Sequence, residues 1–432
     1  MDQPVKTLIG RFSSLQEWLS WQQELHFSSI DLGLERCRLV AERMGLLNPP
    51  YKIVTVAGTN GKGSSAVMLD GILRNAGYHV GCYTSPHLVR YNERILVNGI
   101  ESSDEMLCRS FQNVDQARGD ISLTYFEFGT LAALDIFRDA GLDAGILEVG
   151  LGGRLDAVNI VDADVALLCS IDIDHVNWLG HDRAGIGYEK AGIFRPLKPA
   201  VCADFDPPDS VGRHAENLGT EIFFAGKDFT FTVDGSTWAW NSRGRTISDI
   251  PVPDRYNNMQ IQNAAAVLKV LEILTPDLPV TNAQINESLS RFRMPGRMQI
   301  VDAEIPIVLD VSHNPQAIEN LRKYLDENPV AGATHMVIGF LNDKDYRQML
   351  RIIRKQVDCW YIATLQDERS LDGGILKEEL KNLGVTENIR LFTGAVEAMK
   401  QAQKHSLSGD RIVVTGSFIT VGKAMTCIDM EV

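Results

Sequence analysis

A Gly-rich turn between a strand and a helix constrains this chain more than any other feature. Residues 51–57 (YKIVTVA) form a β-branched run that is typical of a buried strand. The turn GTNGKGSS at 58–65 follows directly, and residues 66–76 have the pattern of a helix. In such a turn the backbone N–H groups, the Lys62 ammonium and the N-terminal helix dipole favour bound phosphate. The segment therefore predicts a phosphate-binding loop at the carboxyl end of a strand.

The spacing of this turn departs from the usual P-loop pattern. Two residues, rather than the usual four, separate Gly58 from Gly61. Gly63 stands directly after Lys62, where a hydroxyl residue is usual, so by spacing alone Ser64 is a weaker candidate for a magnesium ligand than its counterpart in an ordinary P-loop. A plain Gly-rich turn is the alternative interpretation. The strand before the turn and the helix after it favour phosphate binding.

The alternation of strands and helices continues beyond this turn. Strands are predicted at 79–85, 143–149 and 164–171, and a helix at 128–139. This order predicts an α/β fold with a doubly wound, mostly parallel sheet. Residues 197–250 differ in pattern, and the segment FFAGKDFTFTVDGSTWAWNSRGRTISDIPVP at 223–253 is rich in aromatic and β-forming residues with Gly and Asp turns. They predict a small antiparallel β region, a hairpin or meander.

A second alternating set follows the linker-like segment MPGR at 294–297. Its predicted strands are 305–311, 335–340, 359–364, 388–393 and 411–417. We expect a smaller, Rossmann-like α/β domain here. The predicted division of the chain is therefore 1–295 and 296–432.

The composition excludes several classes of protein. The 42 basic and 56 acidic side chains give a formal charge of −14, whereas a general nucleic-acid binder usually carries a basic surface. No run of about 18 uncharged apolar residues predicts a membrane span, and the first 12 residues lack the pattern of a secretory signal. The seven cysteines are scattered, which argues against a zinc ribbon or disulfide framework. We expect a cytoplasmic protein that binds neither nucleic acid nor membranes.

Polar residues at two further strand ends are candidates for a metal site. Glu148 ends the strand at 143–149, and Asp172, Asp174 and His175 follow the strand at 164–171. Ligands of open α/β sheets bind beyond the carboxyl ends of the strands, and Mg²⁺ favours oxygen ligands. The alternatives are a solvated glutamate, aspartates that only end a strand, and a structural histidine.

Four further residues are weaker candidates when each is taken alone. Ser85 ends the strand predicted at 79–85 and could instead act as a cap. Lys190 follows a glutamate, and a surface ion pair is its simplest interpretation. Asp310 ends the first strand of the second set, and Arg297 lies in the linker, where it could reach a phosphate.

Taken together, these segments resemble the folylpolyglutamate synthase/dihydrofolate synthase family, relatives of the Mur amide ligases. The resemblance spans nearly the whole chain in the family's order. It rests on IDLGLER (30–36), VAGTNGKGS (56–64), TSPHLVRYNER (84–94), SLTYFEFGTLAAL (122–134), ILEVGLGGRLDAVN (146–159), DHVNWLG (174–180), EKAGIF (189–194), MPGRMQIV (294–301), LDVSHNP (309–315), GFLNDKD (339–345) and VTGSF (414–418). The ISLTYFEF segment at 121–128 is most similar to the bifunctional bacterial members.

The resemblance implies an ATP-dependent amide ligase. Mg-ATP would phosphorylate a carboxylate to an acyl phosphate, and the amino group of L-glutamate would displace the phosphate. Dihydropteroate would yield dihydrofolate, and reduced folates would gain further glutamates. In this family residues 1–295 would form the ATP-binding domain and 296–432 the glutamate-ligase domain. The resemblance also implies two Mg²⁺ sites, allows a requirement for K⁺, and implies a monomer.

The resemblance assigns roles residue by residue. The ATP contacts would be Thr59, Asn60, Gly61, Lys62, Gly63, Ser64, Asn263, Arg297 and Asp310. The metal ligands would be Ser85, Glu148, His175 and, if carbamylated, Lys190. The pteroate contacts would be Thr124, Tyr125, Phe126, Glu127, Leu155, Asp156 and Ala157. Lys62, Glu148, His175 and Lys190 would carry the catalysis.

Two alternatives remain beside this interpretation. Another Mur-type ligase would act on a cell-wall precursor or a peptide, but the 121–128 and 151–159 segments match the family's pteroate loops. A nucleotide-binding switch or scaffold would share the phosphate loop, but it would need neither Lys190 nor a second α/β domain. The acceptor that supports ATP turnover would distinguish the first alternative, and hydrolysis unaffected by glutamate would favour the second.

Overall fold

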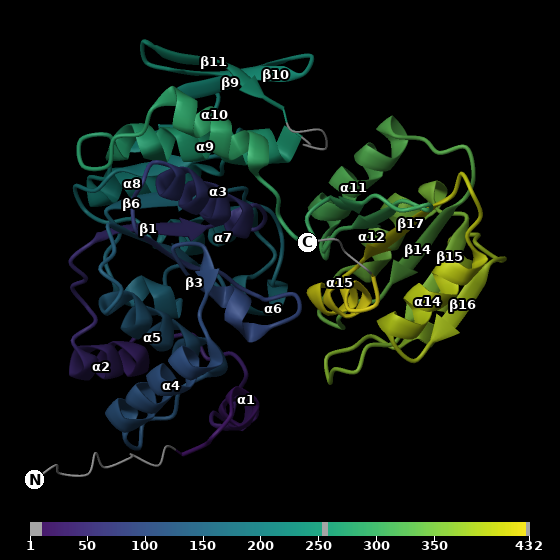
Figure 1. Ribbon diagram of the computed structural model, residues 1–432, viewed down its shortest axis with the longest axis horizontal. Helices are drawn as coiled ribbons and strands as arrows, with labels where there is room; N and C mark the ends of the chain where they lie inside the picture. Colours follow the sequence, from purple (N-terminus) through teal and green to yellow (C-terminus); the bar gives the residue numbers. More distant parts are fainter. Residues whose placement is uncertain (1–10, 253–257, 429–432) are drawn as a thin grey trace, which may run out of the picture.

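The computed structural model describes residues 11–252 and 258–428, and its centre is an eight-stranded sheet (Figure 1). The strand order is β4-β3-β2-β5-β1-β6-β7-β8, and only β3 and β4 run antiparallel to their neighbours. The strands are β1 Lys52–Ala57, β2 Val80–Tyr83, β3 Ile95–Val97, β4 Ile100–Glu101, β5 Ala144–Glu148, β6 Val165–Leu168, β7 Ala200–Cys202 and β8 Ile222–Phe224. The carboxyl ends of β1, β2, β5 and β6 therefore meet at one edge of the sheet.

Helices cover both faces of this large sheet, so the side chains of its central strands are buried on both sides. In β1, Val54 and Val56 face one core, whereas Ile53 and Ala57 face the other. The first face carries α3 Lys62–Asn75, α9 Asn258–Leu274 and α10 Asn282–Arg291. The second carries α1 Leu15–Glu24, α2 Glu35–Met44, α4 Asp104–Arg118, α5 Tyr125–Arg138, α7 Arg183–Ala191 and α8 Asp209–Leu218. Shorter helices are η1 Tyr91–Arg94, η2 Ala157–Ile160 and α6 Val176–Leu179.

A three-stranded antiparallel sheet lies over α9 (Figure 1). Its strands are β9 Phe229–Asp234, β10 Thr237–Ser242 and β11 Arg245–Pro251. Trp238 and Trp240 are buried against α9, and the indole N–H of Trp240 donates to the Ala265 carbonyl at 2.9 Å. Within the region 197–250, β7, α8 and β8 precede the small sheet and extend the large parallel sheet, which the sequence pattern did not indicate. The strands β7 and β8 have only three residues each, so their alternation with α8 leaves little periodicity in the sequence.

The C-terminal residues build a second α/β unit beside the large sheet (Figure 1). Its sheet has the order β12-β13-β17-β14-β15-β16, with only β12 antiparallel. The strands are β12 Gln299–Val301, β13 Ile307–Leu309, β14 Thr334–Ile338, β15 Cys359–Ala363, β16 Ile389–Phe392 and β17 Arg411–Thr415. One core packs α11 Pro315–Glu327, α12 Tyr346–Ile353 and α13 Gly373–Asn382; the other packs α14 Ala395–His405 and α15 Phe418–Met425. The short η3 spans Arg354–Gln356.

The predicted fold class is confirmed, and two helices begin earlier than the pattern indicated. The helix predicted from residue 66 begins at Lys62, and the helix predicted from residue 128 begins at Tyr125. Both shifts place candidate site residues in a first helical turn. Within the described residues no helix is long and apolar enough to span a membrane, and the seven cysteines are all free. The segment tested for a secretory signal lies mostly outside the described residues.

Candidate active site

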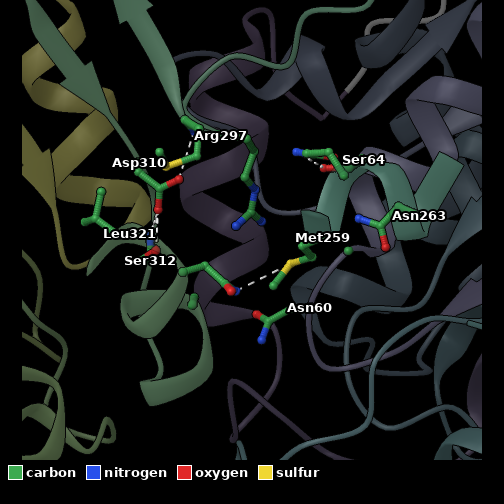
Figure 2. Close-up of a pocket in the computed structure, with 13 residues that line it drawn as sticks. Asn60, Ser64, Met259, Asn263, Arg297, Asp310, Ser312 and Leu321 are labelled. Carbon is green, nitrogen blue, oxygen red and sulfur yellow. Dashed lines mark hydrogen bonds between the residues drawn. The ribbon is translucent and has the colours of Figure 1, made fainter. Parts of the chain in front are cut away.

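A cleft lies where the phosphate loop faces the C-terminal unit. Figure 2 shows Arg297 between a side formed by Asp310, Ser312 and Leu321 and a side formed by Ser64 and Asn263. The remaining lining residues are Asn60, Gly61, Met259, Gln260, Met298, Ala317 and Asn320. Six of the nine predicted ATP contacts line this cleft: Asn60, Gly61, Ser64, Asn263, Arg297 and Asp310.

The phosphate loop leaves the first backbone N–H groups of α3 without a side-chain cap. Gly61 is the N-cap residue with φ 91°, and no side chain accepts a hydrogen bond from this helix start. A Cβ atom at Gly61 would lie 2.5 Å from Asn263 Oδ1, so only glycine fits there. The Lys62 ammonium folds back and donates to the carbonyls of Gly58 at 2.9 Å and Thr59 at 3.2 Å. Positive charge and open N–H groups therefore converge at the loop, which suits an anion.

The side chains of two loop residues have hydrogen-bond partners within the protein. Thr59 Oγ1 donates to the Asp172 carbonyl and accepts from the Asp172 N–H, both at 2.9 Å. Asn60 contacts the C-terminal unit through its side-chain amide. Their backbone N–H groups also have protein partners: Thr59 donates to the Ser170 carbonyl at 2.7 Å, and Asn60 donates to Ser170 Oγ at 3.2 Å. The free N–H groups of this loop therefore belong to the start of α3 rather than to Thr59 and Asn60.

Glu148 lies at the carboxyl end of β5, next to the phosphate loop and Ser85. Its Oε2 accepts the Ser85 N–H at 2.9 Å, and a Cβ atom at Gly63 would lie 3.4 Å from the same oxygen. Burial raises the pKa of Glu148, whereas Lys62, the Ser85 N–H and Arg297 lower it. Two of the four predicted metal ligands are thus adjacent.

His175 and Lys190 are the other two predicted metal ligands, and their pKa values share a cause. Burial lowers the pKa of Lys190 to about 7, with a further contribution from Lys62. Burial also lowers the pKa of His175 to about 4, although Asp174 opposes it. Near neutral pH the histidine is uncharged, and much of the lysine is an unprotonated amine. Among the described residues no group of three His, Cys, Asp or Glu side chains could hold a metal ion. The four predicted metal ligands include only one such glutamate, Glu148, and one such histidine, His175.

Arg297 and Asp310 lie at the entrance to the C-terminal unit. The carboxylate of Asp310 accepts the Met298 N–H at 2.8 Å, the Ser312 N–H at 2.9 Å and the Ser312 hydroxyl. It therefore ties the linker to the end of β13. Burial lowers the pKa of Arg297, and its guanidinium lies 5.0 Å from the ring centroid of Phe418.

The first predicted pteroate segment forms the first turn of α5. Thr124 caps this helix and Glu127 completes the capping box, with the Thr124 N–H donating to Glu127 at 2.8 Å. Arg36 also donates to Glu127, at 3.1 Å, so this carboxylate has protein partners. Tyr125 lies edge-on to Tyr91, and Phe126 stacks on Tyr83 with centroids 5.9 Å apart.

The second predicted pteroate segment begins η2, which packs against α5. Asp156 is buried and accepts the N–H groups of Leu151 at 2.8 Å and Val158 at 3.1 Å. Burial raises the pKa of Asp156 to about 7 despite these bonds. Leu155 is partly exposed and Ala157 is buried. The structure thus brings both segments together, and it gives the carboxylates of Glu127 and Asp156 local structural partners.

Residues of the C-terminal unit that sequence reasoning did not assign also meet the N-terminal loops. Lys344 donates to Asp174 at 2.8 Å, and Asn314 donates to Asp174 at 3.2 Å. Burial alone would raise the pKa of Asp174, but the Lys344 ammonium holds it well below its ordinary value. Both partners lie in segments that carry the resemblance, LDVSHNP and GFLNDKD. Nothing in the local pattern, however, indicates contact across the cleft.

Comparisons with known proteins agree with this geometry. Residues 296–418 match the model of the Mur ligase glutamate ligase domain. A phosphate loop that faces such a domain defines a Mur-type ligase.

Full-length relatives narrow the class further. The dihydrofolate synthase/folylpolyglutamate synthase of Escherichia coli is 43% identical over 96% of each chain, and that of Haemophilus influenzae is 37% identical over 96% of this chain and 98% of its own. A structure of E. coli FolC in complex with DHPP and ADP has a TM-score of 0.90, with 43% identity over 96% of this chain and 98% of that one. This chain belongs to the dihydrofolate synthase/folylpolyglutamate synthase family.

A further solved structure concerns the ligands of a relative. A bifunctional folylpolyglutamate synthase/dihydrofolate synthase with Mn, AMPPNP and L-glutamate bound has a TM-score of 0.88, with 43% identity over 96% of this chain and 98% of that one. That relative therefore binds a nucleotide, a divalent metal ion and glutamate in one chain.

Proposed function

We propose that this chain is an ATP-dependent ligase that joins L-glutamate to dihydropteroate and to the glutamate tail of reduced folates. One observation carries the proposal: the phosphate loop faces a glutamate ligase domain across one cleft, in a chain related over its full length to enzymes of that name. ATP would phosphorylate the acceptor carboxylate to an acyl phosphate. The glutamate amine would then displace phosphate and form the amide.

The nucleotide end of the cleft supports phosphoryl transfer. The open N–H groups of α3 would bind phosphate oxygens, and Lys62 would turn from the loop carbonyls toward them. Arg297 would add charge from the C-terminal side, where positive groups stabilise the transferring phosphoryl oxygens. Asn263 would contact the nucleotide from α9. Asp310 would act by holding the linker that carries Arg297.

The predicted metal ligands fit Mg²⁺ in their chemistry. Glu148 offers a carboxylate beside Ser85, and His175 is neutral near pH 7. An unprotonated Lys190 amine is the form that reacts with CO₂, and the resulting carbamate would supply an oxygen ligand. A bound metal ion would neutralise charge on the phosphoryl oxygens. We propose two such sites, with K⁺ as a further cation.

The pteroate would lie against Phe126 and the segment 155–157. An aromatic ring stacked on Tyr83 offers an apolar face of fixed orientation, which suits a flat pterin ring. Thr124, Tyr125 and Ala157 would shape the same site. Glu127 and Asp156 would hold its walls in place, because their carboxylates already cap local backbone. We further propose that the enzyme is a monomer, acts in the cytoplasm, and works on small molecules without nucleic acid or membranes.

Product analysis by mass spectrometry tests the function. The reactions contain ATP, Mg²⁺ and L-glutamate with either dihydropteroate or tetrahydrofolate. We expect a glutamylated product from both acceptors and one ADP for each amide formed. Product from tetrahydrofolate alone would reduce the function to polyglutamylation. Product from neither acceptor, with ADP still bound, would overturn the proposal.

A further inference from the structure

A continuous group of buried polar side chains joins the phosphate loop to the C-terminal unit. Asn60 Nδ2 donates to Asn314 Oδ1 at 3.2 Å, and Asn314 Nδ2 donates back to Asn60 Oδ1 at 3.0 Å. Asn60 is 7% exposed and Asn314 is 3% exposed. A reciprocal amide pair of this kind satisfies both groups only while the two parts of the molecule are in contact.

Asn314 extends this pair to the loop that carries His175. Its Nδ2 also donates to Asp174 Oδ2 at 3.2 Å, and Lys344 Nζ donates to Asp174 Oδ1 at 2.8 Å. The side chains of Asp174 and Lys344 are 9% and 7% exposed. Asp174 Oδ1 in turn accepts the His175 N–H at 2.7 Å, so the same carboxylate shapes the backbone at the predicted metal ligand.

Gln316 adds a second contact from the first turn of α11. Its Oε1 accepts from Asn60 Nδ2 at 2.6 Å and from Ser170 Oγ at 3.2 Å. Asn314 itself caps α11, because its Oδ1 accepts the Ala317 N–H at 3.0 Å. The rigid start of one helix therefore holds both the phosphate loop and the loop after β6.

Because these polar side chains are buried, separating the two parts of the chain would be costly in free energy. Removing one partner of a buried hydrogen bond leaves the other unsatisfied, which is more costly than the net value of the bond itself. A buried ion pair such as Asp174–Lys344 likewise tolerates the loss of one partner poorly. The network therefore favours one relative position of the two parts of the chain over neighbouring positions.

We propose that Asn314 is a positioning residue that acts through Asn60 and Asp174. It holds the glutamate ligase domain at one separation from the phosphate loop, and so sets the distance between the nucleotide phosphates and the amine that attacks. The effect on turnover rests on the proposed function, whereas the effect on domain separation does not.

The Asn314→Ser variant separates capping from positioning. Serine still caps a helix, but its hydroxyl is too short to reach Asn60 and Asp174 together. We expect small-angle scattering of the full-length protein to give a larger radius of gyration than the unaltered protein. We expect kcat to fall about tenfold or more, because small misplacements of reacting groups are costly, with the KM for ATP changing much less. Unchanged scattering together with unchanged kcat would overturn the proposal.

A double-mutant cycle and a matched control complete the test. If Asn314 acts through Asn60, Asn314→Ser with Asn60→Ser lowers kcat no further than the more damaging single variant, whereas additive losses would contradict the coupling. Asp372→Ser is the control, because Asp372 caps α13 of the same unit by accepting the Gly374 N–H, a contact within the C-terminal unit. It should leave scattering and kcat unchanged.

A second variant at the same position keeps the proposal testable if Asn314→Ser does not fold. Asn314→Asp keeps a capping oxygen at the helix N-terminus but lacks the amide donor and places a carboxylate beside Asp174. It should expand the molecule as Asn314→Ser does, and an unexpanded Asn314→Asp variant would count against the proposal. Should the unaltered protein form no amide, the proposed function fails, and the scattering comparison still decides this inference.

Discussion

Lys190 lies in surroundings that are unusual for a lysine. It is buried at the end of α7, and burial lowers its pKa to about 7. We predict that Lys190→Ala abolishes amide formation, since the proposed carbamate can no longer form. ADP affinity, measured by calorimetry, should stay close to that of the unaltered protein. Lys198→Ala is the control, because Lys198 is a half-exposed lysine paired with Asp164. Normal turnover in Lys190→Ala would remove the lysine from the mechanism.

His87 gives the stability of the folded state a dependence on pH. It accepts a hydrogen bond from Arg94 Nε at 2.8 Å, and burial together with the Arg94 charge lowers its pKa to about 4. The unfolded chain binds this proton near the ordinary value of 6.5, so between pH 6.5 and 4 the unfolded state binds more protons and stability falls as the pH falls.

The matching variant is His87→Gln, which keeps an acceptor for Arg94 but does not titrate. We predict that the unaltered protein loses about 1 kcal/mol more of its free energy of unfolding than the variant between pH 7.5 and pH 5.5. Urea unfolding at the two pH values measures this difference. An equal loss in both proteins would mean that His87 keeps an ordinary pKa in the fold.

At the scale of elements, the loop after β5 and the first turn of α5 meet at one close contact. A Cβ atom at Gly150 would lie 2.6 Å from Phe126 Cζ, so the ring would have to move. We predict that Gly150→Ala raises the KM for dihydropteroate about tenfold, the scale of a misplaced apolar contact. The KM for ATP should change little. Steady-state kinetics with each substrate varied in turn measures both.

A control for this substitution lies on α8. A Cβ atom at Gly212 meets nothing closer than 3.9 Å, and alanine is the better helix former. Gly212→Ala should therefore leave both KM values unchanged. A Gly150→Ala enzyme with an unaltered KM for dihydropteroate would place the pteroate site away from Phe126.

At the scale of the whole molecule, the predicted division at residues 295 and 296 has a physical test. Among the described residues, the two cores of the C-terminal unit are built from the unit's own side chains, with the partly buried Leu88 as the one addition from outside. We predict that residues 296–432 expressed alone unfold cooperatively on heating, as followed by circular dichroism. A fragment from residue 320, which lacks β12, β13 and the start of α11, should not. A non-cooperative 296–432 fragment would mean that the unit depends on the N-terminal domain for its stability.

The order of elements, the phosphate loop and the family were all accessible from the sequence, because each depends on local chemistry. A β-branched run, glycines that permit a tight turn and a lysine at a helix start are visible within the 26 residues from 51 to 76. The predicted start of α3 was late because the glycine and serines of its first turn also suit a loop. The predicted start of α5 was late because apolar periodicity does not register the capping box of Thr124 and Glu127.

Only the tertiary structure decided how the predicted residues are used. Asn60 and Asn314 are 254 positions apart, and Asp174 and Lys344 are 170 apart, so no local pattern links them. Likewise, Glu127 and Asp156 stand in segments that match the family's pteroate loops, yet their carboxylates hold backbone N–H groups. Local sequence determines which residues an edge of a sheet presents. The packing of two domains determines which of those residues meet each other and which remain open to a ligand.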